Sequence, residues 1–123
     1  MKNDTERRRK AERLGRRAEW LVAFAYLLRG YQVLQRRYKV KSGEVDLIFR
    51  KKQVVVLCEV KARSDLETAI EAVTAKSRRR IERAGQYYLT KNAHLAEQGV
   101  RYDIAHVKGW WPNIIKDAWR EGD

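Results

Sequence analysis

Residues 44–63 read "EVDLIFRKKQVVVLCEVKAR" and contain two short apolar segments joined by a basic turn. Val45 to Phe49 and Val54 to Val60 are rich in β-branched and aromatic residues, which predicts two strands connected as a hairpin. Each predicted strand nevertheless carries an acid, Asp46 in the first and Glu59 in the second. Half-buried strands rarely hold unpaired charge, so these two acids require a physical explanation.

Side-chain alternation places Glu59 and Lys61 on one face of the second strand and Val60 on the other. If the strands pair through their short turn, Asp46 can lie across from Glu59 on the same face. Two carboxylates about 4 Å apart repel by about 4 kcal/mol at an effective dielectric constant of 20, which is too much for a marginally stable domain. A divalent cation reverses this repulsion. Mg²⁺ and Mn²⁺ prefer oxygen ligands, so Asp46, Glu59 and the Val60 carbonyl form a candidate metal site.

A phosphodiester is the substrate that best fits such a site. The cation would polarise a nonbridging oxygen and make a water molecule acidic enough to attack phosphorus in line. Lys61 lies two residues beyond Glu59, where it could orient that water or neutralise charge on the phosphorane. The alternative is a structural network of ion pairs, because such networks perturb charged groups in the same way.

The segments around the hairpin predict the rest of the fold. Apolar residues recur at helical spacing before it, which predicts a helix from Thr5 to Arg29 that stops at Gly30. The expected buried seam of this helix consists of Leu14, Ala18, Leu21, Ala25 and Leu28. Tyr31 to Val40 alternates well enough for a strand, and Tyr102 to Val107 predicts a further one.

A second helix is expected between the hairpin and the last strand. Its seam consists of Ile70, Val73, Ser77, Ile81, Ala84 and Tyr88. Thr68 with Glu71 resembles a capping box, and Thr74 could equally begin the main helix. The tail from Gly109 has no clear period, so we expect an irregular or short extended cap. The order helix, three strands, helix, strand predicts an α+β fold with one mixed sheet flanked by two helices.

Length and composition describe one domain over residues 1–123. A hydrophobic content of 44% favours a folded chain, with mobility expected in the basic residues 1–10 and in the tail. The net charge of +12 is typical of a protein that binds nucleic acid or an anionic membrane surface. Cys58 is the only cysteine, which favours a reducing, cytoplasmic location. The apolar run 20–28 is too short to span a bilayer, so no membrane insertion is expected.

Five motifs occur in an order that carries a family resemblance. They are "GRRAE" (15–19), "GEVDLI" (43–48), "EVKAR" (59–63), "EAVTAKSRRRI" (71–81) and "RYDI" (101–104). The pattern resembles the PD-(D/E)XK nuclease superfamily, with Val45 in place of the proline. It resembles the YraN-like family more closely, a group of small bacterial proteins related in fold to archaeal Holliday-junction resolvases.

The resemblance implies a restriction-endonuclease-like core and particular roles for four residues. Asp46 and Glu59 would match the metal-binding acids of the superfamily, and Lys61 would match the lysine of its strand motif. Glu19 would match a glutamate that reaches the metal site from the first helix. Substrate positioning departs from the family pattern at two places. Ser77 stands where a basic residue is expected, with Lys76 beside it, and "RSDLET" lacks the usual aromatic-glycine pair.

Basic residues occur in three runs, on the first helix, on the first strand with its turn, and on the second helix. A single run is most simply a solvated face. Three runs with little acid between them favour phosphate contacts, which weaken steeply as salt rises. The candidate nucleic-acid contacts are Arg16, Lys76, Arg79, Arg80 and Arg83. Aromatic residues that could stack on bases, or instead fill a core or a dimer contact, are Tyr87, Tyr88, Trp110, Trp111 and Trp119.

These observations predict a metal-dependent endonuclease that hydrolyses DNA without sequence specificity, with branched or distorted DNA as a candidate substrate. A fold resemblance alone does not establish an activity. The alternative is a non-catalytic nucleic-acid-binding protein on a nuclease scaffold. A membrane-surface protein fits the charge alone. Oligomeric state is left open, although a homodimer would suit an enzyme that cuts junctions.

Overall fold

The computed structural model describes residues 2–63, 65–95 and 97–123 and shows an α+β fold. The elements in chain order are α1 (Lys2–Leu28), β1 (Gln32–Val40), β2 (Gly43–Lys51), β3 (Val54–Lys61), α2 (Leu66–Ala72), α3 (Ala75–Lys91), a 3₁₀ turn (Ala93–Leu95), β4 (Gly99–Lys108) and β5 (Trp111–Trp119). In the described ranges the sheet has five strands in sequential order, antiparallel except for the parallel β3–β4 pair. The predicted mixed sheet flanked by helices, consistent with a restriction-endonuclease-like core, is confirmed.

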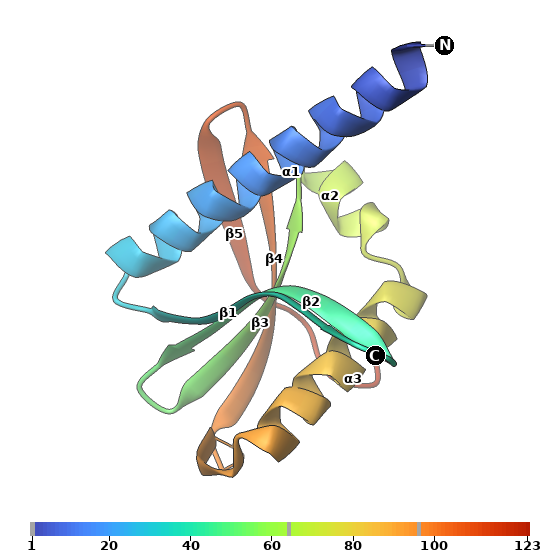
Figure 1. The fold of residues 1–123 in the computed structure, drawn as a ribbon. Coiled ribbons are helices and arrows are strands. Elements are labelled where there is room, and N and C mark those ends of the chain that lie inside the picture. Colours follow the sequence, from blue (N-terminus) through green and yellow to red (C-terminus); the bar gives the residue numbers. More distant parts are fainter. Residues whose placement is uncertain (1, 64, 96) are drawn as a thin grey trace.

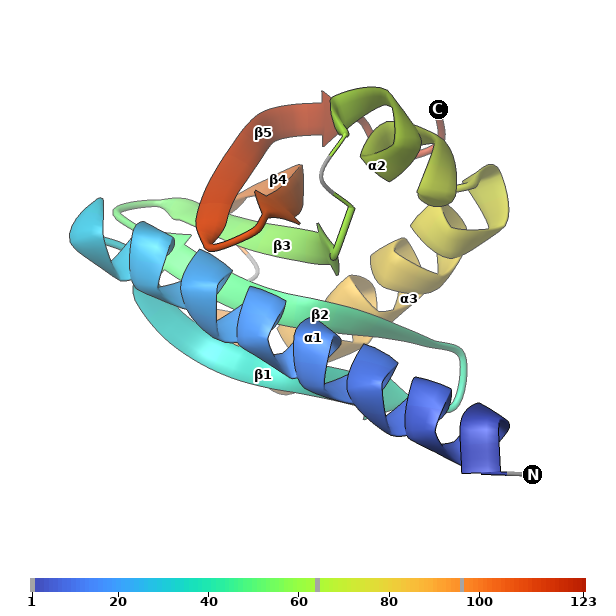
Figure 2. The same ribbon diagram turned by 90° about the horizontal axis from the view of Figure 1, so that it is seen from above.

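Two hydrophobic clusters lie on opposite faces of the sheet. On one face α1 packs over the middle strands, with Tyr26 against Phe49 as the largest contact. On the other face α3 packs mainly over β2 and also contacts β1 and β3, while α2 contacts β4. Ile81 and Leu57 are fully buried there. Figures 1 and 2 show the sheet between these helices, with α2 beside the N-terminal end of α3. Each strand of the middle of the sheet is therefore covered on both sides.

Helix α1 ends as the sequence predicts but buries a different stripe. Gly30 has φ of 87°, and its N–H donates to the Leu27 carbonyl, which ends the helix in the left-handed conformation that glycine favours. The predicted seam residues Leu14 and Leu28 are exposed, by 37% and 74%. The stripe that is buried consists of Ala18, Val22, Ala23, Ala25 and Tyr26. The predicted seam was therefore wrong at both of its ends.

Regular secondary structure extends toward both chain termini. Helix α1 begins at Lys2, before the predicted start at Thr5, within the segment 1–10 whose mobility stays a prediction; residue 1 lies outside the described residues. The tail that we expected to be irregular or a short cap forms β5, which pairs with β4 from Lys108↔Trp111 to Tyr102↔Trp119. Asp117 has φ of 53° in a register shift between these strands. This bulge explains why the tail shows no simple alternation.

Two helices, not one, follow β3. The Asp65 carboxylate accepts hydrogen bonds from the Thr68 N–H and hydroxyl and so caps α2, which replaces the predicted Thr68–Glu71 capping box. The Thr74 hydroxyl accepts a hydrogen bond from the Ser77 N–H and caps α3. The prediction that Thr74 begins the main helix is confirmed. Ser77 is therefore part of a helix start, where its hydroxyl also contacts Thr74.

Two buried acids fasten β5 to the helices. Asp103 in β4 is fully buried and accepts from Arg101, from the Tyr26 hydroxyl and from the Asp117 N–H. On the other face, Glu82 accepts two bonds from Arg79 and one from the Trp119 indole. Each acid is neutralised by an arginine and bonded to two elements, so both networks hold the sheet edge in place.

Helix α3 approaches β2 so closely that only glycine fits at the start of the strand. A Cβ on Gly43 would collide with the Arg80 carbonyl oxygen and lie 2.7 Å from its carbonyl carbon. The obstacle is main chain, so the helix itself would have to move. This contact also sets the N-terminal half of α3 next to β2, three residues from Asp46.

We predict that Gly43→Ala lowers the free energy of unfolding by about 1–3 kcal/mol, the usual cost of overpacking. Gly15→Ala is the matched control, because no described atom beyond the neighbouring residues and the adjacent helix backbone lies within 4 Å of the added methyl group, and alanine favours a helix interior. It should raise the free energy of unfolding by about 0.5–1 kcal/mol. Urea unfolding followed by circular dichroism measures both. Equal effects of the two substitutions would contradict the close packing of α3.

Candidate functional site

The two central strands part at the acids. Strands β2 and β3 are paired from Lys51↔Val54 to Leu47↔Cys58, and Leu47↔Cys58 is the last pair between them. On the outer sides, β2 stays paired with β1 to Gly43↔Val40, and β3 stays paired with β4 to Lys61↔His106. One step beyond the last pair, the same register sets Asp46 opposite Glu59. The predicted pairing of these strands is confirmed, and the acids stand where the strands separate.

Asp46 takes over one hydrogen bond that the parting strands lose. Its Oδ2 accepts from the Val60 N–H at 2.8 Å. Val45 belongs to the core under α3, whereas Leu47 belongs to the core under α1, so strict alternation is broken at Asp46. Opposite Asp46 in β1, Arg37 has φ of 52°, in the left-handed region that few non-glycine residues adopt. Distortion of both strands turns the Asp46 side chain toward β3.

Glu59 is held in an environment that disfavours its charge. Its side chain is 14% exposed. Burial, followed by a hydrogen bond with Asp46 and repulsion from its charge, raises the pKa of Glu59 to about 9. The Lys61 ammonium, 3.7 Å from Glu59 Oε2, opposes this shift without cancelling it. The charged form of Glu59 is therefore disfavoured in the folded chain even with Lys61 beside it.

Glu19 approaches the same acids from α1. Its Oε1 accepts from Arg37 Nε at 2.8 Å. Burial raises the pKa of Glu19, the Arg37 hydrogen bond lowers it, and the nearby Asp46 charge raises it again, with an upward net shift. Arg37 is a site residue that the sequence did not reveal, because nothing in the run "QRRYK" distinguishes it from its neighbours.

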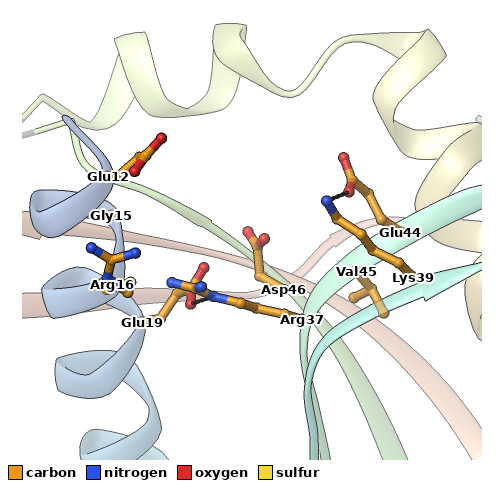
Figure 3. A pocket seen from close by; sticks show the side chains of 9 residues that line it. All are labelled: Glu12, Gly15, Arg16, Glu19, Arg37, Lys39, Glu44, Val45 and Asp46. Carbon is orange, nitrogen blue, oxygen red and sulfur yellow. Dashed lines mark hydrogen bonds and ion pairs between the residues drawn. The ribbon is translucent and has the colours of Figure 1, made fainter. Parts of the chain in front are cut away.

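A hollow of about 370 Å³ opens beside Asp46 (Figure 3). Its walls are formed by Glu12, Gly15, Arg16 and Glu19 of α1, Arg37 and Lys39 of β1, and Glu44, Val45 and Asp46 of β2. Figure 3 shows the Glu19–Arg37 pair between α1 and the Asp46 carboxylate. Asp46 therefore links an open, partly basic hollow to the more buried Glu59 and Lys61.

Comparison with known proteins places this chain in a family. Residues 18–107 match the family described as "Uncharacterised protein family UPF0102". The chain belongs to UPF0102. This is the YraN family, so the resemblance inferred from the five motifs is confirmed.

The relatives of this UPF0102 chain match it over most of its length. A UPF0102 protein of Mesorhizobium japonicum is 44% identical over 112 residues, which are 90% of each chain. A UPF0102 protein of Chelativorans sp. is 43% identical over 91% of each chain. One of Parvibaculum lavamentivorans is 40% identical over 89% of this chain and 84% of its own.

The oxygen ligands at this site suit a hard cation, although the set is small. In the part of the chain that the structure describes, no three His, Cys, Asp or Glu side chains gather closely enough to hold a metal. Glu19 thus does not join Asp46 and Glu59 as a third direct ligand. Two carboxylates and main-chain oxygen can nevertheless hold Mg²⁺, because this ion keeps several waters. The half-buried like charges at Asp46 and Glu59 fit such an ion.

The predicted nucleic-acid contacts fall into two groups. Arg16 lines the hollow, and Lys76 and Arg83 are exposed on α3. The Arg80 main chain packs on Gly43, near the site. Arg79 instead donates to both oxygens of the buried Glu82 and to the Asp123 main-chain carbonyl. This bonding favours a structural role for Arg79 over the predicted phosphate contact. No described helix is both long and apolar enough to cross a membrane.

We predict that Glu59→Gln stabilises the metal-free chain at high pH. The raised pKa means that the folded chain keeps a proton that the unfolded chain loses above about pH 4.5, so the free energy of unfolding falls as pH rises toward 9. In EDTA, Glu59→Gln should therefore raise the free energy of unfolding more at pH 8 than at pH 5, and the two effects should differ by about 1–3 kcal/mol. Urea unfolding at both pH values measures this.

The matched control for this prediction is Glu97→Gln, which changes an exposed glutamate at the opposite end of the β3–β4 pair. It should shift stability equally at pH 8 and pH 5. If Glu59→Gln behaves like this control, Glu59 does not carry an unfavourable charge in the folded chain.

Proposed function

We propose that this UPF0102 chain is a metal-dependent nuclease that hydrolyses DNA phosphodiester bonds. The observation that carries the proposal is the parting of β2 and β3, which brings the Asp46 and Glu59 carboxylates together with Lys61 3.7 Å from Glu59. A purely structural network would neutralise its acids, as Arg101 neutralises Asp103. At Glu59, burial and the neighbouring Asp46 carboxylate raise the pKa, and the Lys61 ammonium 3.7 Å away does not cancel that rise.

A divalent cation, Mg²⁺ or Mn²⁺, is the group that would supply this charge. Asp46, Glu59 and the Val60 carbonyl would hold it, because all three offer oxygen and lie where the strands part. When bound, such an ion polarises a phosphodiester and makes water more acidic. Burial is the main cause of the raised pKa of Glu59, and the cation would counter the smaller contribution from the Asp46 charge.

The remaining side chains of the site have distinct tasks in this proposal. The Val60 N–H fixes the Asp46 carboxylate through Oδ2. Lys61 is placed beside Glu59 to orient the attacking water or to stabilise negative charge on phosphorus. Glu19, carried over from the family resemblance, orients Arg37 at the wall of the hollow. Arg37 and Arg16 would contact the phosphates that flank the bond to be cut.

We predict that Asp46→Asn and Glu59→Gln abolish cleavage of DNA. The assay incubates linear, flapped and four-way-junction DNA with Mg²⁺, Mn²⁺ or EDTA, and wild-type cleavage should require metal. Lys61→Ala should lower the rate by about 10²- to 10⁴-fold, the range for a positioned proton-transfer group. Glu97→Gln should cut like the wild type. The order of rates on the three DNA forms identifies whether branched DNA is preferred.

Cleavage that survives in Asp46→Asn and Glu59→Gln would show that another site or a contaminant is responsible. Binding of all three DNA forms without cleavage in either metal would support the second candidate function, a non-catalytic nucleic-acid-binding protein. One observation favours that candidate: among the described residues, no third acid, histidine or cysteine joins the pair. Its basic surface alone would then be the functional feature.

Substitution of two arginines that lie one helical turn apart on α3 distinguishes a role in phosphate binding from a role in stability. Arg83 is exposed, so Arg83→Ala should weaken binding to all DNA sequences alike and reduce the salt dependence by about one unit of slope. Arg79→Ala should instead lower the free energy of unfolding by about 1–3 kcal/mol, because Glu82 would lose its partner. Fluorescence anisotropy and urea unfolding distinguish these effects. An unchanged salt slope in Arg83→Ala would remove this residue from the contact surface.

A further inference from the structure

Helix α1 leaves a second apolar stripe that its own core does not use. Trp20, Phe24 and Leu27 are exposed by 58%, 60% and 51%. They form one wall of a groove whose other wall is the strand segment 32–36 of β1, and the groove encloses about 660 Å³. We call it the α1–β1 groove. A contiguous exposed apolar surface of this kind marks an interaction site, which raises the question of which ligand fits the groove.

The groove continues directly from the candidate site. Arg37 of β1 bonds Glu19 of α1 inside the hollow, and the preceding residue Arg36 stacks on Trp20, the next residue of α1. The Arg36 guanidinium carbon lies 4.1 Å from the centre of the Trp20 ring. Consecutive residues of the same two elements therefore form the wall of the hollow and the start of the groove. A strand bound at one would pass to the other.

Charge selects among the ligands that an apolar groove could take. Arg36 is the one charged residue in the groove wall, and the wall contains no acid. A second copy of this chain also carries a net charge of +12, so it would be repelled from a surface whose charged residue is an arginine. A polyanion with flat rings meets both properties, because bases stack on tryptophan and on guanidinium planes while phosphates approach the arginine. Gln32 and Gln35 add amide groups that can bond base edges.

We propose that the α1–β1 groove binds unpaired bases of DNA, through stacking on Trp20 and Arg36, while the adjoining backbone enters the candidate site. The substrate class is then DNA in which a single-stranded segment adjoins a duplex. This inference rests on the DNA binding in the proposed function, but it does not require cleavage. The groove gives no sequence preference, since every base offers a ring face.

The test measures binding in EDTA by fluorescence anisotropy. The probes are a 20-nucleotide single strand, a blunt duplex of the same length and an abasic strand with the same number of phosphates. Trp20→Ala should weaken binding of the base-containing strand by about 5- to 100-fold, and leave the duplex and the abasic strand within about twofold. Arg36→Lys keeps the positive charge but removes the planar guanidinium group that can stack. It should therefore weaken binding of the base-containing strand more than binding of the duplex or the abasic strand.

Two further variants keep the test decisive. Trp20→Phe retains a ring and should restore most of the binding lost in Trp20→Ala, which separates stacking from a folding defect. Val100→Ala is the matched control, because Val100 of β4 is an exposed apolar residue, 39% accessible, that lines neither the groove nor the hollow beside Asp46. It should leave binding of all three probes unchanged.

Three results would overturn the proposal. One is an equal loss for all three probes in Trp20→Ala, which would assign the groove to folding or charge. Another is unchanged strand binding in that variant. The third is a dimer, detected by sedimentation, that Trp20→Ala dissociates without altering base-dependent binding, since a second copy would then occupy the groove.

The fates of the two proposals are separable. Base-dependent binding that needs Trp20, in a wild-type chain that never cleaves, sustains the groove and refutes the nuclease. Metal-dependent cleavage that needs Asp46, without any effect of Trp20→Ala on strand binding, sustains the nuclease and refutes the groove.

Discussion

The separation of β2 from β3 is the constraint on which the candidate site depends. While two strands stay paired, their main-chain groups satisfy each other and side chains alternate between faces. Past Leu47 and Cys58 that arrangement ends, and the Asp46 carboxylate bonds the Val60 N–H in place of β2 main chain. The acceptor at this position is a carboxylate, so its charge is set against Glu59. The same local departure from sheet geometry therefore creates both the opening and the electrostatic problem.

The rest of the fold offsets this unfavourable centre by fixing its surroundings. Asp103 ties β4 to α1 and β5, while Glu82 ties α3 to β5. Each of these acids has its arginine, so burial of its charge is compensated. Gly43 lets α3 press against the start of β2. With both faces held, the strands can part at Asp46 without loosening the sheet around them.

The sequence predicted the features that depend on local pattern. The short turn predicted the pairing of the two strands, within which Asp46 could lie across from Glu59, and the structure supplies the register that parity alone left open. Gly30 and Thr74 acted as the expected helix stop and cap. Features that depend on distant partners were missed. Strand β5 is interrupted by a bulge at Asp117, whose N–H bonds Asp103. Arg37 bonds Glu19 of α1, and Arg79 bonds Glu82 one turn further along α3. Neither partner can be recognised from the run of basic residues in which the arginine occurs.

The formal charges of the cluster formed by Asp46, Glu59 and their neighbours bear on which ligand the cluster can receive. Three carboxylates, those of Glu19, Asp46 and Glu59, face two cations, Arg37 and Lys61, which leaves one negative charge when all are ionised. A proton on Glu59 cancels that charge, which is the state that the raised pKa favours in the absence of metal. Replacing this proton by a divalent cation makes the cluster positive by one. A phosphodiester carries one negative charge, so the metal-loaded cluster would attract it and the metal-free cluster would not. Binding of metal and binding of backbone phosphate at this site are therefore expected to reinforce each other, whereas base stacking in the α1–β1 groove depends on neither charge.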